Sequence, residues 1–493
     1  MIDEKEFNQE ESNDKEELYK PNQPKVNFES NRPYEKPSDV KKPVLSLLRE
    51  NMKTVQDILE ANGDLLNRMD NGEFNNQDDD ALWIQTIAGG LANAALDETP
   101  IMATEREGSD WTQALEHEGK HLRPGKPLVK HDPSRKQTDD EVLSYLSKKS
   151  NRGGPEDFPM VHSGVWVRLR TPLNSEVVVY QQRLANTKER LGRTTKGSAF
   201  SNLGGILLNE TTDFALSLLQ ATNVKYSTPT DLEDHLTTLD EILLHHALAC
   251  LMYPNGFEYS HACVADPSKC NHIEHALLNL NALAWYDAQA FSKRQKDMLS
   301  IRFNTNKLFD AEQLKEYREQ FNCGKQRIIW FGDVGVSLEI PTIRQRKEAA
   351  QRWYDDVAEM INGAFNEPQT GPNRNAFMDA VTNATLARQY AHYVTGIYER
   401  CDEHGERLVS DKVSVIDGYL SQVLSESEVI EQFETEIRKY IADSMVGLVA
   451  IPSWNCPKCE SPQGRNFHER VDHLIPLDIQ TVFFTLSSQR VRM

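Results

Sequence analysis

Apolar side chains recur every three or four positions along several stretches of the chain, and this spacing predicts amphipathic helices. The series nearest the N-terminus begins just after Pro43 and comprises Leu45, Leu48, Met52, Val55 and Leu59. A capping box predicts a second helix start, with Glu233 three residues after Thr230. The other predicted helices span residues 212–222, 240–252, 273–285, 343–365, 373–398 and 426–445.

Short runs of β-branched and aromatic residues predict strands between these helices. In residues 165–170 the valine and leucine side chains share one face and the arginines the other, and residues 177–180 provide a partner strand. A second pair spans residues 328–331 and 336–340, and residues 446–451 form a strand that leads into a cysteine pair. The expected fold class is therefore α+β, mainly α, with helical domains, short strand pairs and cysteine turns of the zinc-knuckle type.

Breaks in this pattern divide the chain into five segments. The first is acidic, contains five prolines and has almost no apolar periodicity, so we expect an arm that is disordered or extends over a neighbouring subunit. The strongest breaker is the run Arg152-Gly153-Gly154-Pro155. The segments are an arm (1–43), a small helical region (44–135), a linker (136–159), a middle α+β domain with a Cys/His cluster (160–325) and a C-terminal helical domain that ends in a CxxC knuckle (326–493).

Composition narrows the classes of function. The 493 residues include 55 basic and 75 acidic side chains, which gives a net charge of −20. This charge repels a phosphate backbone and no basic patch offsets it, so nucleic-acid binding is not expected. No stretch is apolar enough for a membrane span, and the N-terminus is acidic where a signal peptide would be basic. We expect a soluble protein that is made in a cytosol and has no membrane partner.

The cysteines favour metal ligation. Seven is an odd and low number, and four of them occur in close pairs, which suits reduced thiols or metal ligands better than disulfides. Cys456 and Cys459 enclose Pro457-Lys458 in the CxxC form of a zinc knuckle. A thioredoxin-like redox pair would need a helix directly afterwards, and residues 460–464 are a poor helix start. The motif therefore predicts a structural metal site.

A second cluster of candidate ligands lies between residues 250 and 275, and three interpretations stay open. One assigns a separate zinc ion to Cys250, Cys263, Cys270 and His272. Another joins two members of this cluster to the CxxC pair in one four-thiolate site that ties the C-terminal segment to the middle one: Cys263, Cys270, Cys456 and Cys459. The third treats these cysteines as small buried apolar side chains that bind no metal.

The run His117-Glu118-Gly119-Lys120-His121 matches the HExxH motif of zinc peptidases, in which two histidines on one helical face bind zinc and the glutamate is the general base. Gly119 lies inside the motif, and Pro124 ends any helix within a turn. Glu141 falls where some such enzymes place a third ligand. We expect no catalytic residues here, and a zinc metallopeptidase remains the alternative.

Other catalytic signatures are absent from the sequence. It contains no Walker A sequence, no GxGxxG, no GxSxG elbow and no HxE followed by PCxxC. The pair His245-His246 lacks the adjacent aspartate of an HD phosphohydrolase motif. We therefore expect a protein that is not an enzyme.

Several short segments, taken together and in order, resemble a known class of proteins, although no single segment is enough to identify it. In the first half they are residues 160–167, 221–224, 253–257, 263–267 and 269–272, and in the second half residues 386–394, 456–459 and 474–478. Their order along the chain resembles virion structural proteins of large contractile-tailed bacteriophages, and the later ones resemble baseplate hub proteins of T-even-like phages. The resemblance covers roughly residues 160–493.

This resemblance implies a virion component of the tail baseplate, at or near the hub, that acts in assembly through protein–protein contacts. Its expected partners are other tail proteins in a symmetric multi-subunit particle. The resemblance matches four residues to the family's cysteine positions: Cys263, Cys270, Cys456 and Cys459. A zinc-ribbon tail-assembly chaperone that is absent from the virion is the second alternative. Residues 1–159 lie outside the resemblance.

Overall fold

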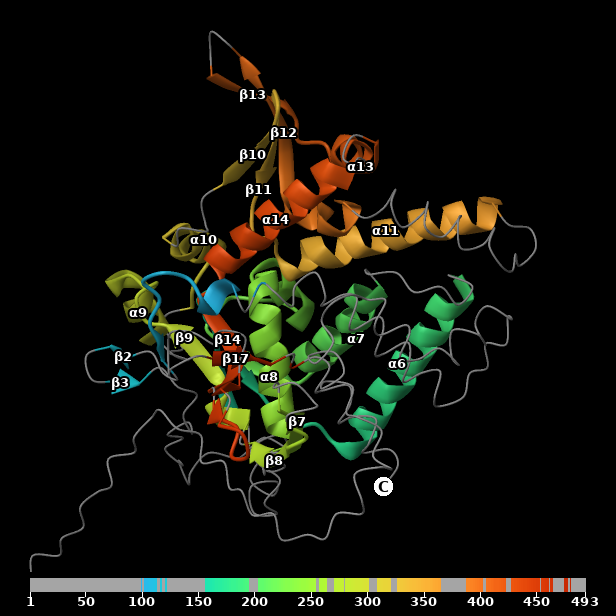
Figure 1. Cartoon of the computed structure of the whole chain (residues 1–493). Coiled ribbons are helices and arrows are strands. Elements are labelled where there is room, and N and C mark those ends of the chain that lie inside the picture. Colours follow the sequence, from blue (N-terminus) through green and yellow to red (C-terminus); the bar gives the residue numbers. More distant parts are fainter. Residues whose placement is uncertain are drawn as a thin grey trace, which may run out of the picture.

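The computed structural model describes the chain from residue 99 onward, with gaps. The described residues are 99, 102–112, 116–117, 120–121, 156–194, 203–253, 257–263, 270–278, 280–300, 308–320, 326–364, 387–401, 405–422, 427–452, 454–460, 462–463, 474–477 and 479. The predicted arm (1–43) and the predicted helix at 45–59 lie outside them. This part of the chain is a helix-rich mixture of α and β structure whose sheets are small and antiparallel, so the predicted α+β class is confirmed (Figure 1).

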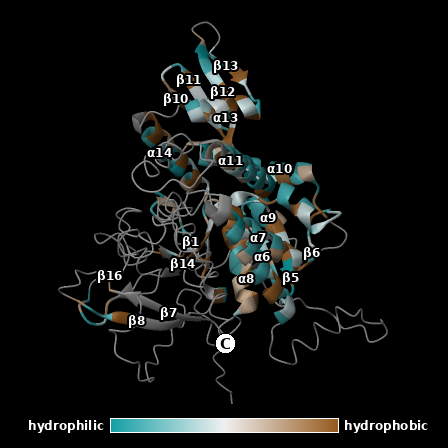
Figure 2. Cartoon of the chain, turned by 90° about the vertical axis from the view of Figure 1, so that its right-hand side faces the viewer, coloured by the Kyte–Doolittle hydropathy of each residue, from teal (hydrophilic) through white to brown (hydrophobic). Residues whose placement is uncertain are grey.

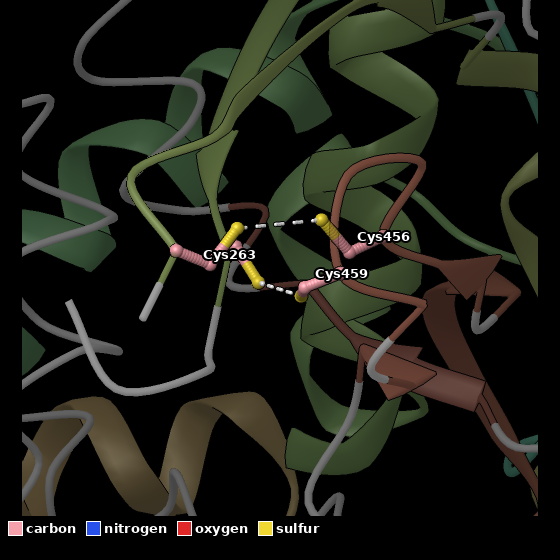
Figure 3. A group of neighbouring side chains, drawn as sticks. Cys263, Cys456 and Cys459 are labelled. Atoms are coloured by element: carbon pink, nitrogen blue, oxygen red, sulfur yellow. Dashed lines mark hydrogen bonds between the residues drawn. The ribbon is translucent and has the colours of Figure 1, made fainter. Parts of the chain in front are cut away.

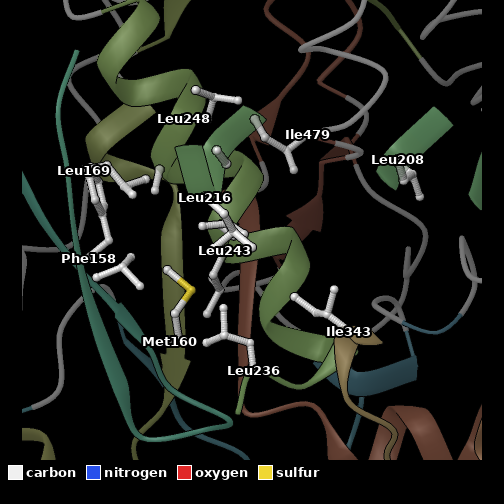
Figure 4. Close-up of a cluster of buried hydrophobic side chains, with 14 of the residues drawn as sticks. Phe158, Met160, Leu169, Leu208, Leu216, Leu236, Leu243, Leu248, Ile343 and Ile479 are labelled. Atoms are coloured by element: carbon white, nitrogen blue, oxygen red, sulfur yellow. The ribbon is translucent and has the colours of Figure 1, made fainter. Parts of the chain in front are cut away.

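The largest core lies between a three-stranded sheet and three helices. The sheet has the order β4 (Glu156–Met160), β5 (Val165–Leu169), β6 (Leu219–Thr222), and the helices are α6 (Asn174–Thr194), α7 (Leu203–Ser217) and α8 (Glu241–Met252). Figure 4 shows Phe158, Met160 and Leu169 of the sheet facing Leu243 and Leu248 of α8. Trp353 and Val449 belong to the same cluster, so this core crosses the predicted boundary at residue 325.

Helix α6 corrects one prediction. Residues 177–180 were expected to form a strand, but they lie in the first turns of this 21-residue helix. Val177, Tyr180, Leu184 and Leu191 are buried on one face at helical spacing. A run of valines was thus misread, because burial of one helical stripe outweighed the local strand preference. The strand at 165–170 is confirmed as β5, and its partners are β4 and β6.

Three further predictions in this region need correction. The helix expected at 273–285 is instead β8 (Ile273–Leu278), the short turn η3 (Leu280–Ala282) and β9 (Ala284–Asp287). The helix expected at 212–222 begins earlier, as α7, and its last residues form β6. The capping box lies at Thr228 and Asp231 and opens only the 3₁₀ turn η1 (Pro229–Asp234). The helix at 240–252 is confirmed as α8, which the short turn η2 (Thr238–Asp240) precedes.

A second core lies under a four-stranded sheet. Its order is β10 (Arg327–Phe331), β11 (Val334–Leu338), β12 (Val394–Cys401), β13 (Gly405–Ser410), and it packs on α13 (Val413–Gln422), α14 (Ser427–Ser444) and the 3₁₀ segment η5 (Ala387–Tyr393). The predicted strand pair around Gly332 is confirmed, as are the helices at 343–365, which is α11 (Ile343–Ala364), and at 426–445. The described end of the helix expected at 373–398 is η5 and β12 instead, because its aromatic and β-branched residues pair with β11.

Another four-stranded sheet joins distant parts of the chain. Its order is β1 (Trp111–Thr112), β9, β14 (Gly447–Pro452), β17 (Leu474–Pro476), which confirms the strand predicted at 446–451. The remaining helices, α9 (Lys293–Ser300) and α10 (Ala311–Glu319), pack beside the first core. The predicted linker (136–159) ends inside β4. No helix in the described ranges is long and apolar enough to cross a membrane.

Candidate metal centre

The first half of the candidate site is built on a two-stranded ribbon. Strand β7 (Phe257–Ala262) pairs antiparallel with β8, and Cys263 directly follows β7 while Cys270 lies three residues before β8. The backbone N–H of Cys263 donates to the carbonyl of His272 at 2.9 Å, which extends the ladder past the strand ends. The ribbon therefore holds the two cysteine backbones beside each other.

The second half is a tight turn near the C-terminal end. Strands β15 (Trp454–Asn455) and β16 (Pro462–Gln463) pair on either side of Cys456-Pro457-Lys458-Cys459. The N–H of Glu460 donates to the carbonyl of Cys456 at 2.8 Å, and Glu460 adopts a φ of 58°. A non-glycine residue in the left-handed region is uncommon, so surrounding contacts must hold this turn closed.

The two halves meet at their sulfur atoms. The Sγ atoms of Cys263, Cys270, Cys456 and Cys459 all lie within 4.8 Å of one another. The Cys263–Cys459 and Cys270–Cys456 pairs are 3.5 and 3.8 Å apart (Figure 3). Four sulfurs placed tetrahedrally about 2.3 Å from one ion would be about 3.8 Å apart. The described geometry therefore fits a single tetrahedral metal ion.

The surroundings of the sulfurs suit a closed site. Cys263, Cys270 and Cys456 are 8 %, 3 % and 2 % exposed, and Cys459 is half-buried. They form a small cluster of their own, separate from the two large cores. Four protein ligands fill a tetrahedral shell and leave no position for water or substrate, which is the arrangement of structural rather than catalytic sites.

Electrostatics at Cys270 show what a cation would change. The backbone N–H of His272 lowers the pKa of the Cys270 thiol, but burial and the thiols of Cys459 and Cys456 raise this pKa by more, so it lies above its ordinary value. The thiols of Cys459 and Cys456 thus oppose the loss of the Cys270 proton, whereas the thiol of Cys263 favours it. A bound cation reverses this opposition, because it stabilises every thiolate that it contacts.

One polar contact bridges the two halves outside the sulfurs. The ammonium group of Lys458, inside the CxxC turn, donates a hydrogen bond to Oδ1 of Asn271, next to Cys270. Both side chains are exposed, so this contact contributes modestly to stability. It nevertheless brings a positive charge to a group of four thiols.

Two of the six predicted ligands lie elsewhere. Cys250 is on α8, and its Sγ is 3.5 Å from Nε2 of His246 in the first core. Burial raises the pKa of this thiol, which keeps it protonated. The imidazole of His272 is not in the group of ligand atoms that come together, although its backbone hydrogen-bonds both cysteines of its ribbon. A separate site of Cys250, Cys263, Cys270 and His272 is therefore not formed.

The HExxH run does not form the helix that a zinc peptidase requires. Glu116–His117 and Lys120–His121 are two short strands, β2 and β3, and His117 pairs with Lys120 while His121 pairs with Glu116. In the peptidase motif the two histidines lie one helical turn apart on the same face. Glu118, Gly119 and Glu141 lie outside the described residues.

A buried polar centre that the sequence pattern does not predict lies in the turn between β4 and β5. His162 donates from Nδ1 to Asp240 Oδ1 at 2.9 Å, and its Nε2 accepts from the backbone N–H groups of Val446 and Gly447 at 3.0 and 3.2 Å. Ser163 donates to the other oxygen of Asp240. Since Nε2 is occupied by backbone donors, His162 cannot act as a base toward Ser163, and the group is structural.

This centre could have been suspected from its sequence. Residues 160–167 are apolar except for His162 and Ser163, and a polar pair inside an apolar run must find buried partners. Its partners, Asp240 and the start of β14, are too distant in the chain to be read from the sequence. No family model, curated protein or solved structure matches this chain.

Proposed function

We propose that this chain is a structural protein in which one zinc ion, bound by Cys263, Cys270, Cys456 and Cys459, fixes the C-terminal segment to the β7–β8 ribbon. The observation that carries the proposal is the meeting of four sulfurs from two segments that are almost 200 residues apart, with spacings close to those of a tetrahedral site. A closed shell of this kind supports a fold and leaves no open position for catalysis.

Zinc is the proposed ion because of its ligand preferences. Four thiolates at tetrahedral spacing suit zinc or iron, and zinc forms such sites without redox chemistry. The low number of cysteines and their pairing fit a reducing compartment, where thiolates remain available for a metal.

We further propose that the assembly served by this protein is the tail baseplate of a contractile-tailed phage, near the hub, with other tail proteins as partners. The support is the ordered set of segments that resembles this class, and two groups of these segments are in contact in the fold. The turn from residues 160–167 hydrogen-bonds Asn223 of the 221–224 segment, since Asn223 accepts from the N–H of Trp166 at 2.8 Å. The segments 263–267, 269–272 and 456–459 contribute the four cysteines.

The zinc proposal is tested by elemental analysis of the purified full-length protein and of three variants. We expect about one zinc per chain in the wild type, loss of zinc in Cys456→Ser, and no loss in Cys401→Ser or His117→Ala. Cys401 is the matched control because it lies in β12, outside the group of four sulfurs. If iron is found in place of zinc, the four-cysteine site stands and only the identity of its ion changes. Zinc that follows His117 instead would overturn the proposal and support the peptidase alternative.

The assembly proposal is tested by mass spectrometry of purified particles of the phage that encodes the chain. We expect the protein in intact virions and in isolated tails, at a constant ratio to the other baseplate proteins. Its presence in infected cells together with absence from particles would contradict a baseplate role and support the assembly-chaperone alternative. This outcome is independent of the zinc measurement.

A further inference from the structure

Strand β13, at one edge of the β10–β13 sheet, and the first turn of α13 carry a concentration of exposed apolar side chains. Four large apolar residues between positions 408 and 415 are 43 to 54 % exposed: Leu408, Val409, Val413 and Val415. All residues from 405 to 415 are exposed except Ser410, which is half-buried. An exposed apolar strip with a polar rim is typical of an interaction surface.

The position of this strip favours contact with another chain. Strand β13 pairs only with β12 among the described strands, so its outer edge presents backbone N–H and C=O groups. Figures 1 and 2 both place β13 at the end of the molecule farthest from the β7–β8 ribbon. Figure 2 shows apolar and polar positions mixed along this sheet. The register with β12 shifts between Ile397 and Tyr398, which leaves Val409 without an opposite residue.

The charged residues on either side of Val409 can form opposite-charge pairs with the same segment of a second copy. Residues 406–412 read Glu-Arg-Leu-Val-Ser-Asp-Lys. Consider two copies of this segment that lie side by side and antiparallel, with Val409 of one copy opposite Val409 of the other; we call this residue the crossing point. In this arrangement Glu406 of each copy faces Lys412 of the other. Arg407 of each copy then faces Asp411 of the other, and the two Val409 side chains meet on the axis. A two-fold contact repeats each pair, so four opposite-charge pairs surround an apolar centre.

Other crossing points lack this match. A crossing at Glu406 or at Arg407 would place that residue against its own copy, and like charges directly opposite are unfavourable. A crossing at Leu408 would place Arg407 against Val409. In the described fold Arg407 already pairs with Glu399 of β12, which holds its guanidinium at the sheet edge. In the contact centred on Val409, Asp411 of the second copy would lie beside this guanidinium, on the side away from β12.

We infer that residues 405–415 form a self-association surface, and that its occupant is the same segment of a second copy of this chain, in an antiparallel two-fold contact centred on Val409. This inference does not depend on zinc or on the baseplate proposal. The segment is short, so the contact is a weak one whose population rises with concentration.

Sedimentation velocity over a concentration series tests the inference on the full-length protein. We expect a monomer–dimer equilibrium in the wild type and a dimer dissociation constant at least about tenfold higher in Glu406→Lys, which places two lysines opposite each other twice. The double variant Glu406→Lys/Lys412→Glu exchanges the two charges and should restore the wild-type constant. Restoration by a second change cannot arise from misfolding.

Net charge provides the matched control. Glu406→Lys changes the net charge from −20 to −18, because one negative charge is replaced by one positive charge. This change alone would favour association by reducing general repulsion. Glu431→Lys, on an exposed position of α14, makes the same change elsewhere and should leave the dimer intact. A wild type that stays monomeric throughout, or equal dimerisation of Glu406→Lys and the double variant, would overturn the inference.

Discussion

At the scale of single residues, two buried histidines of α8 are held neutral by the interior. Burial lowers the pKa of His245 and of His246 to about 4. The hydroxyl of Thr212 donates to Glu241, so it can only accept from Nε2–H of His245, 3.1 Å away. Nδ1 of His245 has no hydrogen-bond partner. A second proton on this ring would therefore be buried without an acceptor.

These histidines make stability fall in acid. The pKa of an unfolded histidine is about 6.5, so the unfolded chain takes up protons between about pH 6.5 and pH 4 while the folded chain does not. The stabilisation is fully present above pH 6.5 and is lost as the pH falls through this window. From pH 7 to pH 5 we expect a loss of about 2 kcal/mol in the free energy of unfolding for each histidine, measured by urea unfolding.

The variant His245→Gln isolates this contribution. Glutamine can still donate to Thr212 but does not titrate, so the slope of stability against pH should be shallower than in the wild type by the share of one histidine. The cysteine ligands are the same in both proteins, so their proton uptake cancels in the difference. Parallel curves for the two proteins would show that His245 does not contribute to the acid sensitivity.

At the scale of elements, strand β14 enters a tightly packed space. A Cβ added to Gly447 would lie 2.6 Å from Cγ2 of Val161 and 3.2 Å from Cδ1 of Leu243. The backbone of β14 approaches this closely because Val446 and Gly447 donate to His162. Glycine is therefore required here by packing, since its φ is not in the left-handed region.

We predict that Gly447→Ala lowers the free energy of unfolding by about 1 to 3 kcal/mol, because the new methyl group overpacks the turn beneath it. Gly418 is the matched control: it lies in α13, where an added Cβ meets nothing within 4 Å. Gly418→Ala should raise stability by about 0.5 to 1 kcal/mol, since alanine is the better helix former. Urea unfolding at neutral pH measures both, and equal effects of the two changes would contradict the packing argument.

Local sequence determines some elements of this fold and leaves others open. Helices α11 and α14 were predicted because an apolar stripe persists over three or more turns. The errors at residues 177–180 and 273–285 share one cause. In a short apolar run, strand and helix spacing cannot be told apart, and the choice depends on which distant surface covers the run.

The sequence predicts the type of candidate site, a cysteine-ligated metal, but not which cysteines bind the same ion. The CxxC spacing and the density of cysteines identified the residues, because ligand chemistry is local to the motif. Whether Cys263 and Cys270 would join Cys456 and Cys459 depends on the sheet in which β14 lies between β9 and β17, and thus on contacts between segments that are far apart in the chain. The buried centre at His162 was missed for the same reason.

At the scale of the whole molecule, a buried ion pair fixes α11 to the other helices of the first core. Arg346 of α11 contacts Glu241 of α8 at 2.7 Å, and both side chains are almost fully buried. Arg346 also donates to the carbonyl of Gly205 in α7 at 3.0 Å. Loss of one partner of such a pair leaves a buried charge uncompensated, so this contact fixes α11 against the first core. The candidate metal centre lies outside both cores, in a cluster of four cysteines.

This separation predicts that removal of the metal acts locally. Cys263, Cys270, Cys456 and Cys459 form a cluster of their own, and none of these four sulfurs belongs to either large core. After chelation, or in Cys456→Ser, amide hydrogens of β7, β8, β15 and β16 should exchange at least about tenfold faster, because local opening no longer breaks metal bonds. Strands β10 to β12 and helix α11 should keep their protection, and Cys401→Ser should match the wild type throughout. If all segments lost protection together, the metal would be required for the whole fold. The two cores would then not be stable without the metal cross-link between the β7–β8 ribbon and the C-terminal segment.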